Sequence, residues 1–137
     1  MLTTMGAWSA EPFGNDTAAD FAWELDESAD WTPVSSALDD VLAESDWLEA
    51  DVASIGIAAA EVVAHGLGRP TQSDGYTESV EAFVGRMGRP GADLVYKAER
   101  VLTAAQTHES ELRQLWNESD PTEWLAANTR ILEALKG

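Results

Sequence analysis

The sequence contains no cysteine, so it cannot form a disulfide, a thiol nucleophile or a thiolate metal site. It also lacks a long apolar run, because the longest nearly apolar stretch, residues 52–64, is shorter than a bilayer span and contains Glu61. The first residues, MLTTMGAWSAE, have neither a basic start nor an apolar segment, and therefore predict no signal peptide. We expect a soluble, cytoplasmic protein.

Basic residues are scarce and unevenly placed. The 137 residues include 8 Lys and Arg against 25 Asp and Glu, which gives a formal net charge of −17. Residues 1–64 hold 14 of the acids and no Lys or Arg. The negative electrostatic potential of these acids repels nucleic acid and anionic membranes, and it attracts a basic partner to the N-terminal half. The alternative is that the acids only keep the surface solvated.

Strand-like alternation is also missing, whereas apolar residues recur at helical spacing almost everywhere. The segment at residues 51–65 is apolar on nearly every side, so it should be the buried central helix. We expect an all-α fold: one compact domain over residues 1–137, built as an orthogonal or irregular bundle of six to seven helices. Residues 1–5 would form a flexible extension, and residues 68–76 the longest loop. The spacing predicts helices at about residues 16–25, 33–42, 51–64, 77–87, 92–106, 112–116 and 121–135.

The stretch MGAWSAEPFGNDTAADFAWELDE, residues 5–27, contains the start of the first helix. Asn15 or Asp16 can cap this helix by accepting hydrogen bonds from its free backbone N–H groups. Trp8 and Phe13 precede the cap and can fold back to close one end of the core. The alternative is a partner surface of exposed aromatic side chains beside acids. Its members would be Trp8, Phe13, Asp20, Trp23, Asp26, Glu27 and Asp30.

Glu61 lies inside the most apolar helix, where an unpaired charge would be costly. His65 follows four residues later and shares its helix face. A paired, structural Glu61 is the simplest interpretation. The alternatives are a general acid or base, or a metal site, although Glu-x-x-x-His is not the spacing of di-iron bundles. Glu24 and His108 could complete such a site only if the fold brought them together.

Two short segments repeat a pattern: LGRP at residues 67–70 and MGRP at residues 87–90, each after an apolar helix. Gly followed by Pro commonly ends a helix, because Gly accepts a left-handed conformation and Pro prevents continuation. The alternative is that Arg69 and Arg89 converge on an anion or a carboxylate. Together with Glu61 they would then line an interhelical pocket.

Three longer stretches resemble a known family: MGAWSAEPFGNDTAADFAWEL, WLEADVASIGIAAAEVVAHGLGRP and SELRQLWNESDPTEWLA. Together they are similar to the pattern of a bacterial family catalogued as domain-of-unknown-function family 4259. The similarity extends from Met5 to about Leu135 and rests on Gly-x-Trp, Pro-Phe-x-Asn-Asp-x-Ala and Glu-Leu-Arg-x-Leu-Trp. Ser9 stands where that pattern often has Gly. The resemblance implies an identity but no activity.

Motifs for common chemistries are absent. The segment GLGRP lacks the Lys-Ser/Thr of a phosphate loop, no Gly-x-Ser-x-Gly occurs, and two histidines leave little for a hydrolytic triad. We expect no cofactor, no metal, and no nucleic-acid or membrane partner. The sequence predicts a non-enzymatic interaction module whose acidic half docks a basic protein, as a bacterial immunity protein docks a basic toxin. The alternative is a small-ligand or metal-binding enzyme with a pocket around Glu61 and His65.

Overall fold

The computed structural model describes residues 7–44 and 46–137 of the chain. Over these residues the fold is all-α, in one compact domain of seven α-helices, with two isolated β-bridges in place of strands. The prediction of a flexible extension at residues 1–5 falls outside the described residues. The helices are α1 (Asp16–Glu24), α2 (Thr32–Ala43), α3 (Ala50–Gly66), α4 (Glu78–Met87), α5 (Ala92–Ala105), α6 (Glu111–Asn117) and α7 (Thr122–Lys136), with short 3-10 helices η2 (Leu25–Glu27) and η3 (Gly75–Thr77).

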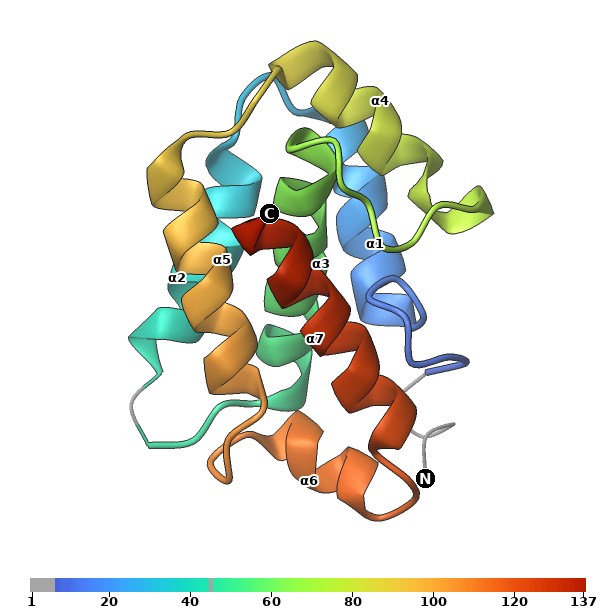
Figure 1. The fold of residues 1–137 in the computed structure, drawn as a ribbon, viewed down its shortest axis with the longest axis vertical. Helices are drawn as coiled ribbons and strands as arrows, with labels where there is room; N and C mark the ends of the chain where they lie inside the picture. The colour runs from blue at the N-terminus through green and yellow to red at the C-terminus, as the bar shows by residue number, and fades with distance from the viewer. Residues whose placement is uncertain (1–6, 45) are drawn as a thin grey trace.

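Helix α3 runs through the centre of the fold (Figure 1). It contacts each of the other six α-helices of the described chain, with α1, α2, α5 and α7 around its length, α4 near its C-terminal end and α6 near its N-terminal end. Every residue of α3 from Ile57 to His65 is buried. The predicted central helix is confirmed, and its apolar character on all sides follows from having neighbours on all sides.

Gly56 lets α3 approach two neighbouring helices closely. A Cβ atom at this position would overlap the Val41 side chain on α2 and come within 3.0 Å of Val101 Cγ1 on α5. Gly in a helix interior costs about 1 kcal/mol relative to Ala. The close packing of three helices offsets that cost, so glycine here serves packing and not flexibility.

Several helices begin where a short polar side chain accepts a hydrogen bond from a backbone N–H group of the first turn. Asn15 caps α1 by accepting such a hydrogen bond at 2.9 Å, as predicted. Pro33 stands in the first turn of α2, which begins at Thr32, one residue before the predicted start. Asp120 accepts from Thr122 N at 3.0 Å, but α7 begins at Thr122, one residue later than the predicted start at Pro121. The starts of these helices are therefore set by local chemistry.

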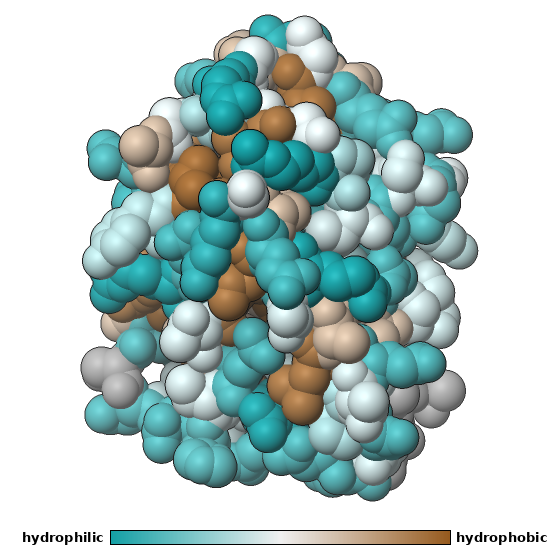
Figure 2. Space-filling view, viewed as in Figure 1, coloured by the Kyte–Doolittle hydropathy of each residue, from teal (hydrophilic) through white to brown (hydrophobic). Residues whose placement is uncertain are grey.

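Figure 2 shows the face of the molecule on which α5 and α7 lie. Hydrophilic side chains cover most of it, and apolar side chains show between them where α5 passes the C-terminal end of α7. In the described parts of the chain, no helix combines the length and the apolar character needed to cross a bilayer. On this face the apolar side chains that reach the surface lie between helices and not on their outer sides.

Candidate functional site

The opening segment folds into a closed loop in front of α1. An isolated antiparallel bridge pairs Ala7 with Asn15, and Trp8 N donates to Gly14 O at 2.8 Å. Gly14 lies so close to Ser9 that a Cβ atom would collide with the Ser9 side chain and come within 2.8 Å of its carbonyl oxygen. This loop therefore requires glycine at position 14, and it closes tightly with serine at position 9.

A second connection fixes α6 against the start of α3. Leu48 N donates to Glu109 O, and Glu111 N donates to Leu48 O, both at 2.8 Å. The Glu111 carboxylate also accepts from Ala50 N at 2.8 Å. It thereby caps α3, whose own N-cap residue, Glu49, makes no side-chain cap bond. A side chain 61 residues away along the chain thus satisfies the first turn of the central helix.

A pocket of about 380 Å³ opens between these two structures. Its walls come from four parts of the chain: the opening loop, the first turns of α3, helix α6 and the start of α7. Helix α6 and the start of α7 lie at the lower end of the molecule in Figure 1. The pocket therefore joins segments from both ends of the sequence.

Acidic side chains dominate the polar lining of this pocket. Four carboxylates line it, and none of the described lining residues is Lys, Arg or His. Two of them are partly engaged, since Glu111 caps α3 and Glu11 Oε2 accepts from Arg130 Nη2 at 3.0 Å. Within residues 7–44 and 46–137, no group of three or more His, Asp or Glu side chains is arranged to hold a metal ion. Carboxylates without an opposing cation among the described lining residues give this pocket a negative potential. The four acids are Glu11, Glu49, Asp51 and Glu111.

Two largely buried tryptophans, 7% and 4% exposed, contribute the aromatic part of the lining. Trp116 from α6 and Trp124 from α7 stack with ring centroids 6.1 Å apart and an interplanar angle of 13°. Leu112 and Leu115 add to the apolar lining. Carboxylates beside aromatic rings bind guanidinium and ammonium groups through ion pairs and cation–π contacts. The pocket thus has the chemistry of a receptor for a cationic side chain.

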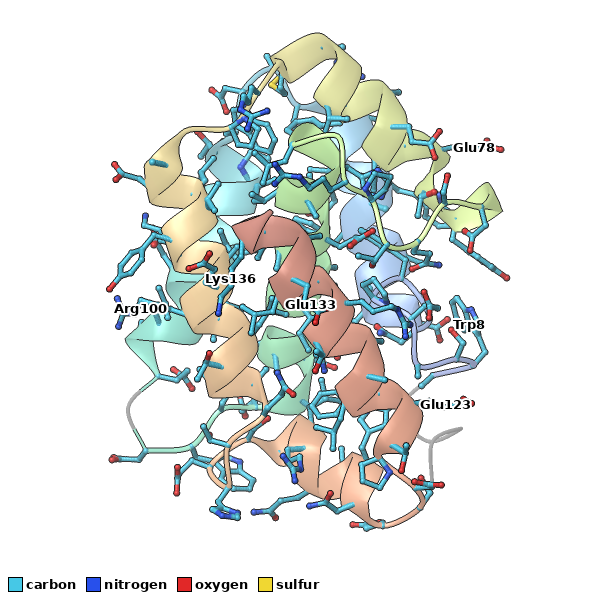
Figure 3. All side chains as sticks on the ribbon, in the orientation of Figure 1. Trp8, Glu78, Arg100, Glu123, Glu133 and Lys136 are labelled. Atoms are coloured by element: carbon cyan, nitrogen blue, oxygen red, sulfur yellow. The ribbon has the colours of Figure 1, made fainter. Side chains whose placement is uncertain are left out.

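The predicted partner surface around α1 is only partly a surface. Phe13 is fully buried in the core and cannot touch a partner, which corrects its place in the predicted set. Trp8 is 47% exposed at the edge of the molecule (Figure 3), and its ring centroid lies 5.3 Å from that of Tyr76. Trp23 is 67% exposed. The opening loop therefore turns Phe13 inward and leaves Trp8 outside, whereas Trp23 is exposed on α1. All four predicted acids are exposed: Asp20, Asp26, Glu27 and Asp30.

Two of these acids also take part in local structure. Asp26 Oδ2 accepts from Ser79 Oγ at 3.1 Å, which connects η2 to α4. Asp30 Oδ1 accepts from Thr32 N at 3.0 Å. The hydrogen bonds from Thr32 lower the pKa of Asp30 below its usual value of 3.8. Asp30 therefore stays charged at neutral pH while it supports the start of α2.

Glu61 is fully buried, and donors surround its carboxylate. Oε2 accepts from the backbone N–H groups of Thr71 and Gln72, both at 2.8 Å, and Oε1 accepts from Thr71 Oγ1 at 2.8 Å. His65 Nε2 lies 3.1 Å from Glu61 Oε2 and 3.0 Å from Gln72 O. Both of these oxygens are acceptors, so Nε2 carries a proton. The predicted pairing with His65 is present, and the loop after α3 supplies the other partners.

Gln72 extends this network to the opening loop. Its Oε1 accepts from Phe13 N at 2.8 Å. A buried carboxylate on α3 thus holds the loop of residues 67–77, and that loop holds the opening segment. Neither Glu61 nor His65 lines any of four pockets found in the described chain. The geometry gives Glu61 a structural role.

The predicted interhelical pocket does not form as one cavity. Glu61 and His65 lie in the core, under the loop that follows α3. Arg69 and Arg89 are exposed and line a separate pocket beside the end of α7. Glu24 and His108, which a catalytic or metal site could have recruited, are exposed side chains. The four residues of the prediction are Glu61, His65, Arg69 and Arg89.

The sequence pattern alone does not reveal the acidic pocket. Glu49, Asp51 and Glu111 have the pattern of ordinary solvated charges. Trp116 and Trp124 belong to helical apolar patterns, which indicate burial without indicating neighbours. The one available signal is that both tryptophans fall in SELRQLWNESDPTEWLA, a stretch that carries the family resemblance.

Fold and pocket together define a class: an all-α domain with an acidic, tryptophan-lined cavity where its first and last segments meet. Each of the three stretches that carry the resemblance contributes to the wall of this cavity. The model of the family described as "Domain of unknown function (DUF4259)" matches residues 6–127, and the chain belongs to this family. Comparisons with curated proteins and with solved structures found no match.

Proposed function

We propose that the chain is a non-enzymatic interaction module that docks a basic protein and receives one of its Arg or Lys side chains in the acidic pocket. The observation that carries this proposal is the lining: four carboxylates and two stacked tryptophans, without a Lys, Arg or His among the described lining residues. The volume of about 380 Å³ is that of a pocket for a small ligand or one long side chain.

Both the carboxylates and the aromatic rings of the pocket would stabilise a bound cationic side chain. One carboxylate at 4 Å contributes about 4 kcal/mol at an effective dielectric constant of 20, before the cost of desolvation is subtracted. Contact with an aromatic ring adds about 0.5–2 kcal/mol. Asp51 and Glu49 are the more available acids, because Asp51 Oδ1 accepts only a long hydrogen bond of 3.4 Å from Thr17 and Glu49 makes no cap bond.

The exposed acids on and after α1 would steer a basic partner toward this half of the molecule. Asp20, Asp26, Glu27 and Asp30 are exposed, and residues 1–64 contain no Lys or Arg to oppose them. Such a field raises the association rate more than it raises the final affinity. An immunity-like protein that neutralises a basic toxin in the bacterial cytoplasm is the specific form of this proposal.

The test uses a defined ligand, an arginine-rich peptide, with the matching glutamine peptide as its neutral counterpart. We expect saturable binding of the arginine peptide alone, followed by tryptophan fluorescence at about 0.15 M salt, where long-range attraction is largely screened. Glu49→Gln combined with Asp51→Asn should raise Kd about tenfold, because it neutralises the two most available carboxylates of the pocket.

The matched control is Asp40→Asn combined with Glu44→Gln. It removes the same charge from the same half of the chain, at exposed positions outside this pocket, and should leave Kd near the wild-type value. An equal loss of affinity in both double variants would contradict the role of the pocket. Failure of the wild-type chain to bind the arginine peptide would contradict the docking function itself.

A further inference from the structure

A second pocket, of about 420 Å³, lies where four segments meet: the C-terminal end of α3, the link from α4 to α5, the first turns of α5 and the last turn of α7. Its charge is opposite to that of the first pocket. Arg69, Arg89 and Lys136 line it, and Glu99 is the one acid among the described lining residues. Figure 3 shows Lys136 on this side of the molecule. A chain of net charge −17 thus gathers three of its 8 Lys and Arg around one opening.

These three cations are not engaged in ion pairs. In the described part of the chain, Lys97 pairs with Asp39 at 2.9 Å and Arg130 pairs with Glu11 at 3.0 Å, and no other Lys or Arg forms an ion pair. The sequence has about three acids for each base, so intramolecular partners are abundant. The fold nevertheless leaves the cations of this pocket available to a ligand.

The chain positions Arg69 and Arg89 by the same backbone device. Each follows a glycine of positive φ, Gly68 at 78° and Gly88 at 79°, and each precedes a proline. Arg69 is held further, because its Nη1 donates to Ala134 O at 3.0 Å near the end of α7. That bond fixes the guanidinium at the pocket with Gly137 packed against it, since a Cβ atom at position 137 would lie 3.0 Å from Arg69 Nη2. Among the described residues no other group accepts a hydrogen bond from the Arg69 guanidinium, so its remaining N–H groups can bind a ligand. The repeated Gly-Arg-Pro segments therefore bring two arginines to one opening.

Between the cations the lining is apolar. Leu67, Val95 and Leu135 contribute aliphatic side chains, and Pro90 adds its ring. Apolar side chains are visible in this region of Figure 2. Tyr96 also lines the pocket and is 61% exposed, so its ring is accessible to a ligand. The pocket therefore combines a cationic rim with a surface for an organic group.

We propose that this pocket binds a small organic phosphate monoester, with the phosphate among Arg69, Arg89 and Lys136 and the organic group on the apolar lining. A phosphate dianion matches three cations better than a single carboxylate does, because arginine donates bidentately and lysine adds a point charge. The net charge of the chain does not prevent this, since the Debye length of about 8 Å at 0.15 M salt lets neighbouring charges dominate. The site is separate from the acidic pocket and does not depend on the docking proposal.

Phenyl phosphate is the probe, because it joins one phosphate to an apolar ring. A titration of the full chain followed by ¹H–¹⁵N NMR should shift the amide signals of residues 67–69, 89 and 91–96. Inorganic phosphate and benzoate should each bind about fivefold more weakly, since each lacks one of the two groups that the pocket recognises. Arg69→Gln combined with Arg89→Gln should raise Kd for phenyl phosphate about tenfold.

The matched control is Arg113→Gln combined with Arg130→Gln, which removes the same charge outside this pocket and should bind like the wild type. Because Arg69 also supports α7, Arg89→Gln alone is the second variant, and it should raise Kd about threefold with an unchanged melting temperature. No shift of the pocket signals at millimolar phenyl phosphate would overturn the proposal. An equal loss in both double variants, or tighter binding of benzoate, would overturn it as well.

Discussion

Glu61 shows how a buried carboxylate can be held without an arginine or a lysine. Its donors are the backbone N–H groups of Thr71 and Gln72, the hydroxyl of Thr71 and the imidazole of His65. Hydrogen bonds to charged groups contribute about 1.5–3 kcal/mol each, and several of them together offset the cost of burying the charge. The same bonds fix the loop that carries Gln72, and through it the opening segment.

Glu61→Ala should lower the free energy of unfolding by about 3 kcal/mol or more, because two buried N–H groups lose their acceptor and a cavity remains. Urea denaturation followed by circular dichroism measures this. Thr71→Val removes only the hydroxyl bond and should cost about 1 kcal/mol. A loss below 1 kcal/mol for Glu61→Ala would contradict the structural role assigned to this residue.

Single-residue predictions succeeded where the reason was local. The sequence predicts that Glu61 must be paired, because burial in an apolar helix demands it, and His65 follows at the right spacing. It does not predict Gln72 as a partner, because a polar residue in a loop has no distinguishing pattern. Phe13 was ambiguous for a similar reason, since the direction of its side chain depends on how the whole opening segment closes.

At the scale of a single helix, Asp120 stabilises the start of α7. Its Oδ1 accepts from Thr122 N at 3.0 Å, which satisfies a free N–H group in the first turn of α7. The hydrogen bonds from Thr122 lower the pKa of Asp120 below its usual value of 3.8. A carboxyl group with a lowered pKa in the folded state stabilises that state only while it is ionised.

Asp120→Ala should therefore lower the melting temperature at pH 7, and the difference from wild type should shrink as pH falls. The contribution of Asp120 is fully present above 3.8, its ordinary value, and is lost as pH falls through the lower value of the folded state. Thermal melts from pH 7 to about pH 2.5 measure this. A difference that stayed constant over that range would assign the effect to helix propensity instead of the cap.

Helix positions were predictable from sequence, whereas contacts between helices were not. Caps such as Asn15 and stops such as Gly88 act within a few residues, so their chemistry is visible in the sequence. The cap of α3 comes instead from Glu111, a residue 61 positions away. The acidic pocket was missed for the same reason, since its carboxylates become neighbours only through the packing of α3, α6 and α7.

At the scale of the molecule, repulsion between like charges outweighs pairing. The formal net charge is −17, and in the described residues two Lys or Arg side chains form ion pairs with carboxylates. Self-repulsion of this kind destabilises the compact state, and salt screens it. The fold class could still be predicted, because helical periodicity does not depend on how the surface is charged.

The melting temperature should rise when NaCl is increased from about 10 mM to 0.5 M, because screening weakens more repulsion than attraction. A variant with Asp20, Asp26 and Glu27 neutralised to Asn or Gln should have a higher melting temperature at low salt, and this temperature should rise less as NaCl is added. Differential scanning calorimetry measures both chains. A fall in melting temperature with salt would show that attractive pairs dominate the surface, in conflict with the charges described above.

The pocket between the opening loop and the last helix has a consequence for how the chain is made. Its walls extend in sequence from Ala7 to Trp124, so they cannot meet until Trp124 has left the ribosome. The acidic residues of the first half emerge much earlier, and a growing chain carries their charge without the cavity. Any ligand that requires the cavity would therefore distinguish chains that have been synthesised beyond Trp124 from shorter nascent chains.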